Sequence, residues 1–173
     1  MFFVACLLNL CKIIAKINRY GVFVSEKKIA LASDHGGFEL KAILAEHLRA
    51  MGFSVADLGT NSGESVDYPD YAAKIGEWIS GNPTDMGILI CGSGIGISIA
   101  ANRNSQIRAA LCHDGLSASL SRQHNNANVL CLGARLIGVD SAKDCVNKFL
   151  NTEFEGGRHT ARVEKLSDFI KKE

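Results

Sequence analysis

The sequence has little of several features that mark special classes of protein. Only two prolines occur in 173 residues, so a proline-rich linker is absent and a single domain is expected. The formal net charge is +1, whereas a dedicated nucleic-acid binder is usually strongly basic. The six cysteines form no CxxC pair and show no zinc-ligand spacing, and the chain is too long for a disulfide-stapled mini-protein. We therefore expect a cytoplasmic protein with reduced thiols, with no metal and no nucleic-acid partner.

The first 24 residues lack the long apolar run of a membrane-spanning helix. The run 2–8 is too short to cross a bilayer. The basic residues Lys12, Lys16 and Arg19 follow this run, whereas in a secretory signal the charge comes first. Three interpretations stay open: a surface or membrane-apposed amphipathic helix, a weak targeting segment, or an upstream start that translation does not use. We favour the last two, and we treat residues 1–24 as an extension and residues 25–173 as the domain.

From Lys28 onward, short apolar runs alternate with segments of helical spacing. The run 86–91 is continuously apolar, as in a strand buried on both faces, whereas apolar residues in 38–51 recur every three or four positions. The expected strands are 28–33, 53–58, 86–91, 107–112 and 129–132, and the expected helices are 38–51, 68–79, 96–101, 115–122, 141–150 and about 160–171. These repeated βα units predict an α/β protein, a Rossmann-like three-layer αβα sandwich with a five-stranded, mainly parallel sheet. Ligands of such sheets bind at the carboxyl ends of the strands.

The first expected strand ends in Asp34, His35, Gly36 and Gly37. Two adjacent glycines allow the backbone to approach a ligand closely, and a carboxylate and an imidazole stand beside them. A plain turn, in which Asp34 caps the next helix, explains the same residues about equally well.

A glycine-rich loop follows the third expected strand. Gly92, Gly94 and Gly96 alternate with other residues, and a helix begins directly afterwards, so backbone N–H groups and the helix end could bind an anion. The spacing is GxGxG and no lysine follows, which argues against both a dinucleotide site and a P-loop. Cys91 precedes the loop, where its thiolate could act as a base or nucleophile. For the other strand and helix cysteines, Cys112, Cys131 and Cys145, we expect buried core positions.

The remaining polar candidates lie later in the chain. His124 stands at the end of an expected helix, where it could be a general acid or base or simply a surface histidine. Arg135 follows the fifth strand. Arg158 and Arg162 are four residues apart and would share one helical face, which suits a phosphate, although a solvated basic face is the common alternative. Together these residues predict acid–base chemistry on a small phosphorylated substrate.

Four segments carry a resemblance to a known family. These are ASDHGGFELK, ILICGSGIGISIAANR, SASLSRQHNNANVLCLGAR and FEGGRHTARV. From about Lys28 to the C-terminus, the chain resembles type B ribose-5-phosphate isomerase. That family interconverts ribose 5-phosphate and ribulose 5-phosphate through a cis-enediolate, in the non-oxidative pentose phosphate pathway, without a metal or an organic cofactor.

The resemblance implies four catalytic residues. Cys91 would be the base that moves the proton between C1 and C2. Ser93 and the loop backbone would hold the developing oxyanion. His124 would open the furanose ring by protonating its oxygen, with Asp34 managing the hydroxyl proton. One branch of the family uses a glutamate as base at the position of Ile97, so this chain would belong to the cysteine branch.

The resemblance also implies how the substrate is bound. The sugar would contact Tyr68 and Asn125, the oxyanion would meet Gly92, Gly94, Ile95 and Gly96, and the phosphate would meet His35, Arg135, Arg158 and Arg162. Family members are homodimers, in some cases tetramers, with active sites built from both subunits.

Two alternatives remain. One is a hexose-6-phosphate isomerase of the same family, acting on allose or galactose 6-phosphate. The other is a non-catalytic phosphosugar- or nucleotide-binding module, since a fold does not fix a function. Cys91 and His124 argue against the module, because binding alone needs neither.

Overall fold

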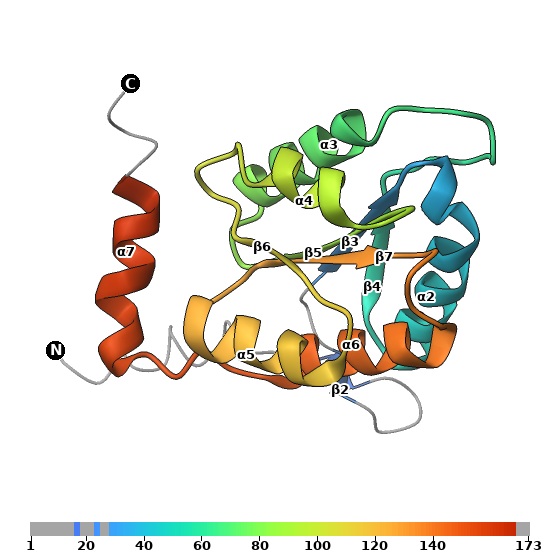
Figure 1. Cartoon of the computed structure of the whole chain (residues 1–173). Helices are drawn as coiled ribbons and strands as arrows, with labels where there is room; N and C mark the ends of the chain where they lie inside the picture. The colour runs from blue at the N-terminus through green and yellow to red at the C-terminus, as the bar shows by residue number, and fades with distance from the viewer. Residues whose placement is uncertain (1–15, 18–22, 25–27, 169–173) are drawn as a thin grey trace, which may run out of the picture.

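A five-stranded parallel sheet forms the centre of the protein in the computed structural model, which describes residues 16–17, 23–24 and 28–168. The strands are β3 (Lys28–Ser33), β4 (Ser54–Asp57), β5 (Met86–Cys91), β6 (Ala109–Leu111) and β7 (Val129–Gly133). They are ordered β4-β3-β5-β7-β6, and every neighbouring pair is parallel. This sheet confirms the predicted fold class (Figure 1).

Helices cover both faces of the sheet, which gives the three expected layers. They are α2 (Phe38–Ala50), α3 (Tyr68–Gly81), α4 (Ile95–Ala101), α5 (Gly115–Asn125), α6 (Val139–Asn151) and α7 (Thr160–Asp168), with the short 3₁₀ turns η1 (His35–Gly37) and η2 (Gly157–His159). Helices α3 and α4 lie on one face, and α2, α5 and α6 on the other (Figure 1). Helix α7 packs on neither face and stands apart from the sheet.

The continuous apolar run of β5 is explained by its central place. Its side chains alternate between two cores: Ile88 and Ile90 pack with the α2 and α6 side, whereas Leu89 and Cys91 pack with the α3 and α4 side. All four are almost fully buried. Burying each of the three aliphatic side chains contributes about 1.5–3 kcal/mol, so the strand is fixed from both faces.

The ends of several elements differ from the sequence-based expectation. Asp114 caps the start of α5 by accepting the Ser117 amide at 2.7 Å. The helix continues to Asn125 and ends where Asn126 adopts the left-handed region at φ 46°. Strand β6 is shorter than expected, helix α4 begins one residue earlier, and helix α6 begins two residues earlier. Gly52 follows the end of α2 at φ 90°, a left-handed conformation that is common just after a helix.

The strand order creates a crevice between the loops that follow β3 and β5. After β3 the chain adds β4 on one side and then returns to place β5 on the other, so the two loops diverge at this point. The Asp34 amide donates to Ile90 O at 3.2 Å. A Cβ on Gly37 would lie 2.7 Å from Ile90 O, so only glycine permits this close approach.

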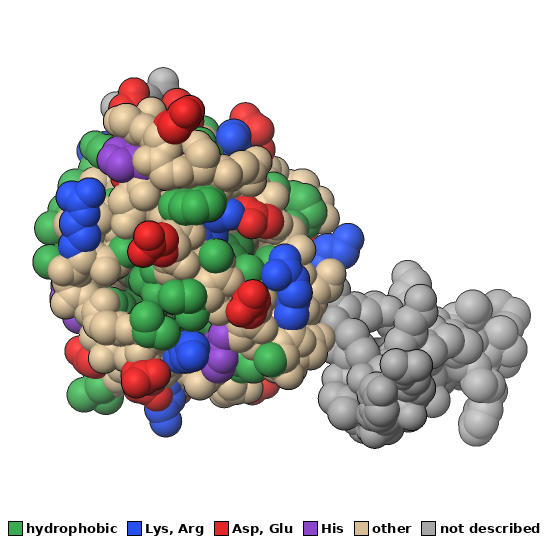
Figure 2. All heavy atoms as spheres, turned by 90° about the vertical axis from the view of Figure 1, so that its right-hand side faces the viewer, with side chains coloured by type: hydrophobic (Ala, Val, Ile, Leu, Met, Phe, Trp, Pro, Cys, Tyr) green, Lys and Arg blue, Asp and Glu red, His purple; other side chains and the backbone are tan. Residues whose placement is uncertain are grey.

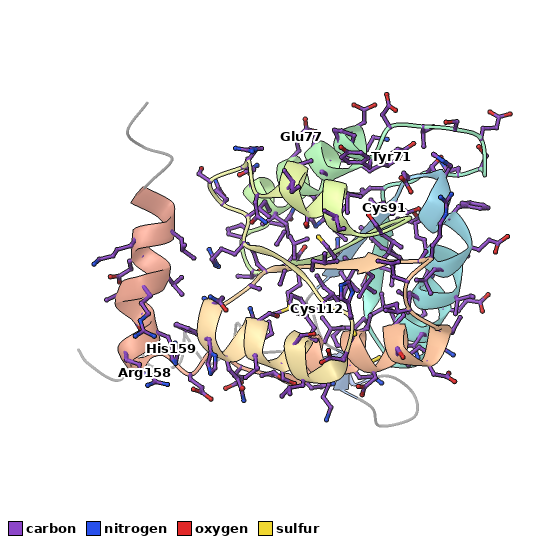
Figure 3. The ribbon with its side chains drawn as sticks, in the orientation of Figure 1. Tyr71, Glu77, Cys91, Cys112, Arg158 and His159 are labelled. Carbon is purple, nitrogen blue, oxygen red and sulfur yellow. The ribbon has the colours of Figure 1, made fainter. Side chains whose placement is uncertain are left out.

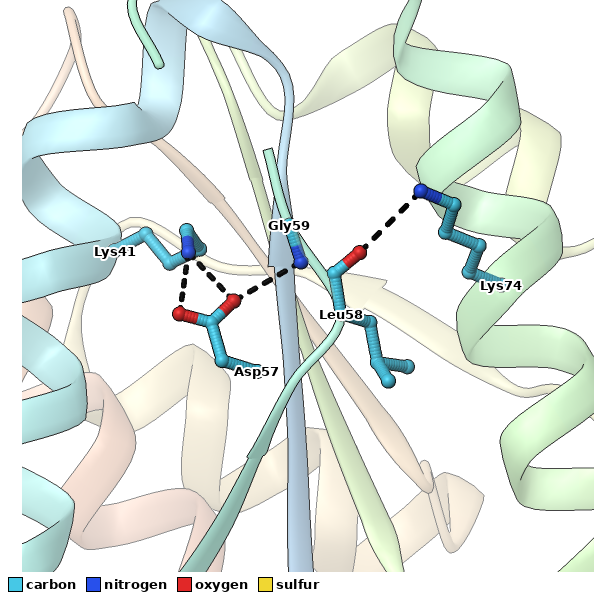
Figure 4. Close-up of polar contacts among 5 residues, drawn as sticks. All are labelled: Lys41, Asp57, Leu58, Gly59 and Lys74. Atoms are coloured by element: carbon cyan, nitrogen blue, oxygen red, sulfur yellow. Dashed lines mark hydrogen bonds and ion pairs between the residues drawn. The ribbon is translucent and has the colours of Figure 1, made fainter. Parts of the chain in front are cut away.

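A charged pair fixes the end of β4 beside this crevice (Figure 4). Lys41 Nζ, in α2, contacts both carboxylate oxygens of Asp57 at 2.5 and 2.6 Å, and the Lys41 side chain is only 3% exposed. Asp57 also accepts the Gly59 amide at 3.0 Å, and Lys74 of α3 donates to Leu58 O at 3.5 Å. These contacts tie the chain after β4 to helices on both faces of the sheet.

The extension predicted for residues 1–24 lies mostly outside the described residues. Within it, β1 (Lys16–Ile17) pairs antiparallel with β2 (Phe23–Val24). The three interpretations of this segment stay predictions. In the described ranges, no helix is both long and apolar enough to cross a bilayer.

Candidate active site

A cavity of about 350 Å³ opens at the carboxyl ends of β3, β5 and β7. Its lining residues are Asp34, His35, Gly36, Tyr68, Cys91, Gly92, Ser93, Gly96, Arg135 and Leu136. A volume of this order suits a small metabolite. The cavity lies where the strand order reverses, as expected for a ligand site in an open parallel sheet.

Cys91 ends strand β5 at the floor of this cavity. The Gly94 amide donates to Cys91 Sγ at 3.0 Å, and a hydrogen bond to sulfur stabilises negative charge on it. Gly94 adopts φ 75°, and a Cβ there would lie 2.5 Å from Leu111 Cδ1 and 2.9 Å from the Leu132 carbonyl carbon. Glycine is therefore needed both for the turn and for the space that places this amide on the sulfur.

The loop after Cys91 also offers N–H groups to a ligand. Among the residues that the structure describes, the amides of Gly92, Ser93 and Gly96 donate to no protein group, whereas the Ile95 amide donates to Ser93 Oγ at 3.3 Å. Gly92, Ser93 and Gly96 all line the cavity. Fixed donors of this kind can stabilise an oxyanion that forms beside the Cys91 sulfur.

The loop after β3 supplies the opposite wall. Asp34 is 7% exposed and accepts the Gly37 amide at 3.2 Å through one carboxylate oxygen, so it does cap the next turn, while it also lines the cavity. His35 Nδ1 lies 3.2 Å from the Val66 amide and 3.1 Å from Val66 O, so the backbone of Val66 holds the ring in either tautomer. The two interpretations weighed for this loop are therefore compatible.

Tyr68 and Arg135 complete the rim. The Tyr68 ring packs on Gly96, where a Cβ would lie 2.7 Å from the ring atom Cζ. The Arg135 amide donates to Gly92 O at 3.0 Å, and its side chain lies over Gly92, where an added Cβ would come within 3.5 Å of it. Both side chains reach solvent at the cavity, where they can meet a polar substrate.

The other predicted site residues lie elsewhere on the chain. His124 and Asn125 end α5, Arg158 lies in η2 and Arg162 in α7. The rings of His124 and His159 are stacked with centroids 4.4 Å apart. Figure 3 places His159 and Arg158 at the end of the molecule near α7, on the opposite side from Cys91. One copy of the chain therefore does not bring this second group of residues to the cavity.

This second group includes donors that could face a metal ion. His124, Glu155 and His159 offer ligand atoms within 4.8 Å of one another. However, Arg158 Nε donates to His159 Nε2 at 3.3 Å, which uses the lone pair that a metal would need. The positive charge of Arg158 also opposes a cation at this place.

The remaining described cysteines are buried free thiols, which confirms the core positions predicted for them. Burial raises the pKa of Cys112 and of Cys131, and it raises the pKa of Cys145 to about 12. These thiols stay protonated at neutral pH. Cys91 is the described cysteine that reaches the cavity.

Three residues near these groups were not anticipated from the sequence. Val66 holds His35 through its backbone, Leu136 lines the cavity although 58% exposed, and His159 stacks on His124. A backbone contact and an exposed leucine leave no signal in a sequence. His159 lies between the two arginines of the segment FEGGRHTARV, and this position in the sequence could have marked it as a site residue.

Acidic and basic side chains are interspersed over the face shown in Figure 2 rather than gathered by sign. A basic stripe would be the electrostatic signature of nucleic-acid binding. In the cavity, an anionic ligand would be recognised by a few placed residues, such as Arg135 and His35.

Comparisons with known proteins agree with this geometry. The family model described as Ribose/Galactose Isomerase matches residues 29–166. Ribose-5-phosphate isomerase B of Escherichia coli is 50% identical over 141 residues, covering 82% of this chain and 95% of the relative.

Solved structures give the same result. Ribose-5-phosphate isomerase B of Clostridium thermocellum is 50% identical with a TM-score of 0.82, over 84% of this chain and 98% of its own. The Mycoplasma genitalium enzyme with bound ribulose-5-phosphate is 43% identical with a TM-score of 0.83, over 86% and 99%. The chain thus belongs to the ribose/galactose isomerase family.

Proposed function

We propose that this protein interconverts ribose 5-phosphate and ribulose 5-phosphate. The observation that carries the proposal is the Cys91 sulfur, which accepts the Gly94 amide in a cavity that also holds a carboxylate and free backbone donors. Moving a proton between adjacent carbons requires one base and a fixed place for the oxyanion. The cavity supplies both, and a relative in the same family binds ribulose 5-phosphate.

Cys91 is the base in this proposal. Its thiolate takes the proton from C2 of the open-chain aldose, the C–H electron pair becomes the C1–C2 double bond, and the carbonyl pair moves onto O1. The amides of Gly92, Ser93 and Gly96, with the Ser93 hydroxyl, stabilise that oxyanion. The thiol then returns the proton to C1, while O2 gives up its proton as C2 becomes the carbonyl carbon and O1 gains one. The backbone around Ile95 completes the loop.

Ring opening precedes this step, because ribose 5-phosphate is a furanose in solution. His124 donates a proton to the ring oxygen, and Asp34 accepts the proton of the C1 hydroxyl. Asp34 lines the cavity, whereas His124 lies with His159 at the far side of the same chain. The two groups can act on one substrate only if a second copy supplies His124.

A homodimer with shared sites meets this requirement. Exposed apolar side chains lie on successive turns of α4 and of α5: Ile95 and Ile99 are 50% and 55% exposed, and Leu116 and Leu120 are 71% and 37% exposed. Helix α7 stands apart from the sheet, and its Leu166 is 46% exposed. A second copy of the chain that covers these surfaces would bring its α5 end and α7 to the cavity. Pairing of such dimers would give a tetramer.

The phosphate is held from both copies in this arrangement. Arg135 and His35 line the cavity of one chain, and the partner adds Arg158 and Arg162 together with the sugar contact Asn125. Tyr68 contacts the sugar from the cavity rim. Arginine guanidinium groups and a histidine N–H suit a phosphate because they form charge-assisted hydrogen bonds to it.

Two further parts of the proposal concern the whole protein. Residues 25–173 form the isomerase domain, and residues 1–24 extend it. We place the enzyme in the cytoplasm, because the four cysteines among the described residues are free thiols, as expected in a reducing compartment.

The direct test is isomerase activity of the protein and of C91A. We expect C91A to lower kcat on ribose 5-phosphate by roughly 10²–10⁴-fold or more while phosphosugar binding survives. C145A, which alters a buried thiol in α6, is the matched control and should keep turnover near that of the unchanged protein. Near-normal turnover by C91A would contradict the assignment of the base. Higher kcat/KM on allose 6-phosphate than on ribose 5-phosphate would instead favour the hexose alternative.

A further inference from the structure

A second imidazole lies directly against the ring of His124. The rings of His124 and His159 are nearly parallel, with an interplanar angle of 7° and centroids 4.4 Å apart. His159 is 6% exposed, whereas His124 is half-buried. The roles proposed above use His124 and leave His159 without a function.

The contacts of His159 define its protonation. Arg158 Nε donates to His159 Nε2 at 3.3 Å, and a guanidinium N–H can only donate, so Nε2 must be the accepting nitrogen. The imidazole is then neutral, with its proton on Nδ1. Its backbone is fixed too, because the His159 amide donates to Gly156 O at 3.0 Å in the η2 turn.

The surrounding charges favour the same state. Burial lowers the pKa of His159, and the neighbouring His124, Arg158 and Arg162 lower it further, against the opposite effect of Glu155. The Glu155 carboxylate lies 4.0 Å from His159 Nε2. Of the two stacked rings, His159 is therefore the one held in the neutral form by its contacts.

We propose that His159 is a positioning residue: its neutral imidazole stacks on His124 and fixes the plane of that ring for proton transfer to the furanose oxygen. This inference rests on the proposed function. Because Arg158 holds the His159 ring with Nε, its terminal amino groups stay available for the phosphate. The phosphate contact and the ring-opening acid are thus held by one connected unit of Arg158, His159 and His124.

Turnover of ribose 5-phosphate and hydrogen exchange in ribulose 5-phosphate together distinguish ring opening from the isomerisation step. Ribose 5-phosphate must be opened before C2 can lose its proton. Ribulose 5-phosphate is acyclic, because the oxygen that would close its furanose ring carries the phosphate. Exchange of its C1 hydrogen with deuterium from D₂O therefore reports on Cys91 and the oxyanion donors without ring opening.

The experiment compares H159A, H159N and H159F in both reactions. We expect H159A and H159N to lower kcat on ribose 5-phosphate by about tenfold or more, as for a poorly placed general acid, with C1 exchange within about twofold of normal. H159F keeps a flat ring against His124 and should recover most of the turnover. H47A is the matched control: His47 bonds Asn147 at 2.9 Å between α2 and α6, and its loss should change neither reaction.

Several outcomes would overturn the inference. Equal loss in both reactions would assign His159 to folding or phosphate binding, and unchanged turnover in H159A and H159N would leave it without a role. Turnover of H159F no higher than that of H159N would exclude positioning by ring stacking. The comparison of these two variants also decides the question if H159A does not fold. The proposed function fails separately: either the unchanged protein shows no isomerisation, or H124A keeps its turnover of ribose 5-phosphate.

Discussion

Replacing Gly94 by alanine tests how the loop holds the catalytic sulfur. Gly94 has φ 75°, and a Cβ would lie 2.5 Å from Leu111 Cδ1 and 2.9 Å from the backbone carbon of Leu132. The left-handed conformation alone costs an alanine about 1–2 kcal/mol. The clash adds about 1–3 kcal/mol, the cost of overpacking a filled site. Gly52 is the matched control, because it has φ 90° with nothing within 4 Å of a Cβ.

The two variants share the backbone strain and the lost chain entropy, so their difference isolates the clash. We expect G94A to be less stable than G52A by about 1–3 kcal/mol in urea unfolding at equal protein concentration. G94A should also lose turnover, since its amide donates to Cys91 Sγ at 3.0 Å and must move, whereas G52A should keep it. Equal stability and equal turnover of the two variants would refute this account of the loop.

Two further predictions concern stability. D57N should lower the free energy of unfolding by about 3–5 kcal/mol, because it leaves the buried Lys41 charge unpaired. K41M should lower it by only about 1 kcal/mol, because Asp57 is 35% exposed and can be hydrated. Equal losses of the two variants in urea unfolding would contradict this asymmetry. Burial holds the pKa of His159 below its ordinary 6.5, so the unfolded chain binds more protons and His159 removes stability as pH falls below that value. Between about pH 7.5 and about pH 5.5, H159F should therefore lose less stability than the unchanged protein, and an equal loss would contradict the neutral state of His159.

The fold was largely predictable because its signals are local. A short, continuous apolar run such as Met86–Cys91 is typical of a strand buried on both faces, and the structure places it at the centre of the sheet. Element ends were less predictable, because they depend on caps that compete with one another. Asn126 tolerates the left-handed region, so α5 ends there and not at Arg122.

The predicted site residues fall into two groups, according to whether they follow a strand or lie on a helix. Residues that directly follow strands, such as Asp34, Cys91 and Arg135, meet in the cavity because parallel strands end at one edge of the sheet. His124 lies in the last turn of helix α5, and no rule of sheet topology places it. A sequence does not say whether such a residue serves its own cavity or that of another copy, and the structure supplies the observation that separates the two groups.

The proposed isomerase site joins Cys91 of one copy to His124 of another. C91A and H124A, each nearly inactive on ribose 5-phosphate alone, are mixed in equal amounts, unfolded and refolded together. Random pairing makes half of the dimers mixed, and each mixed dimer has one intact site of two. We therefore expect the mixture to show about a quarter of the normal activity. Activity no higher than that of either variant alone would contradict it.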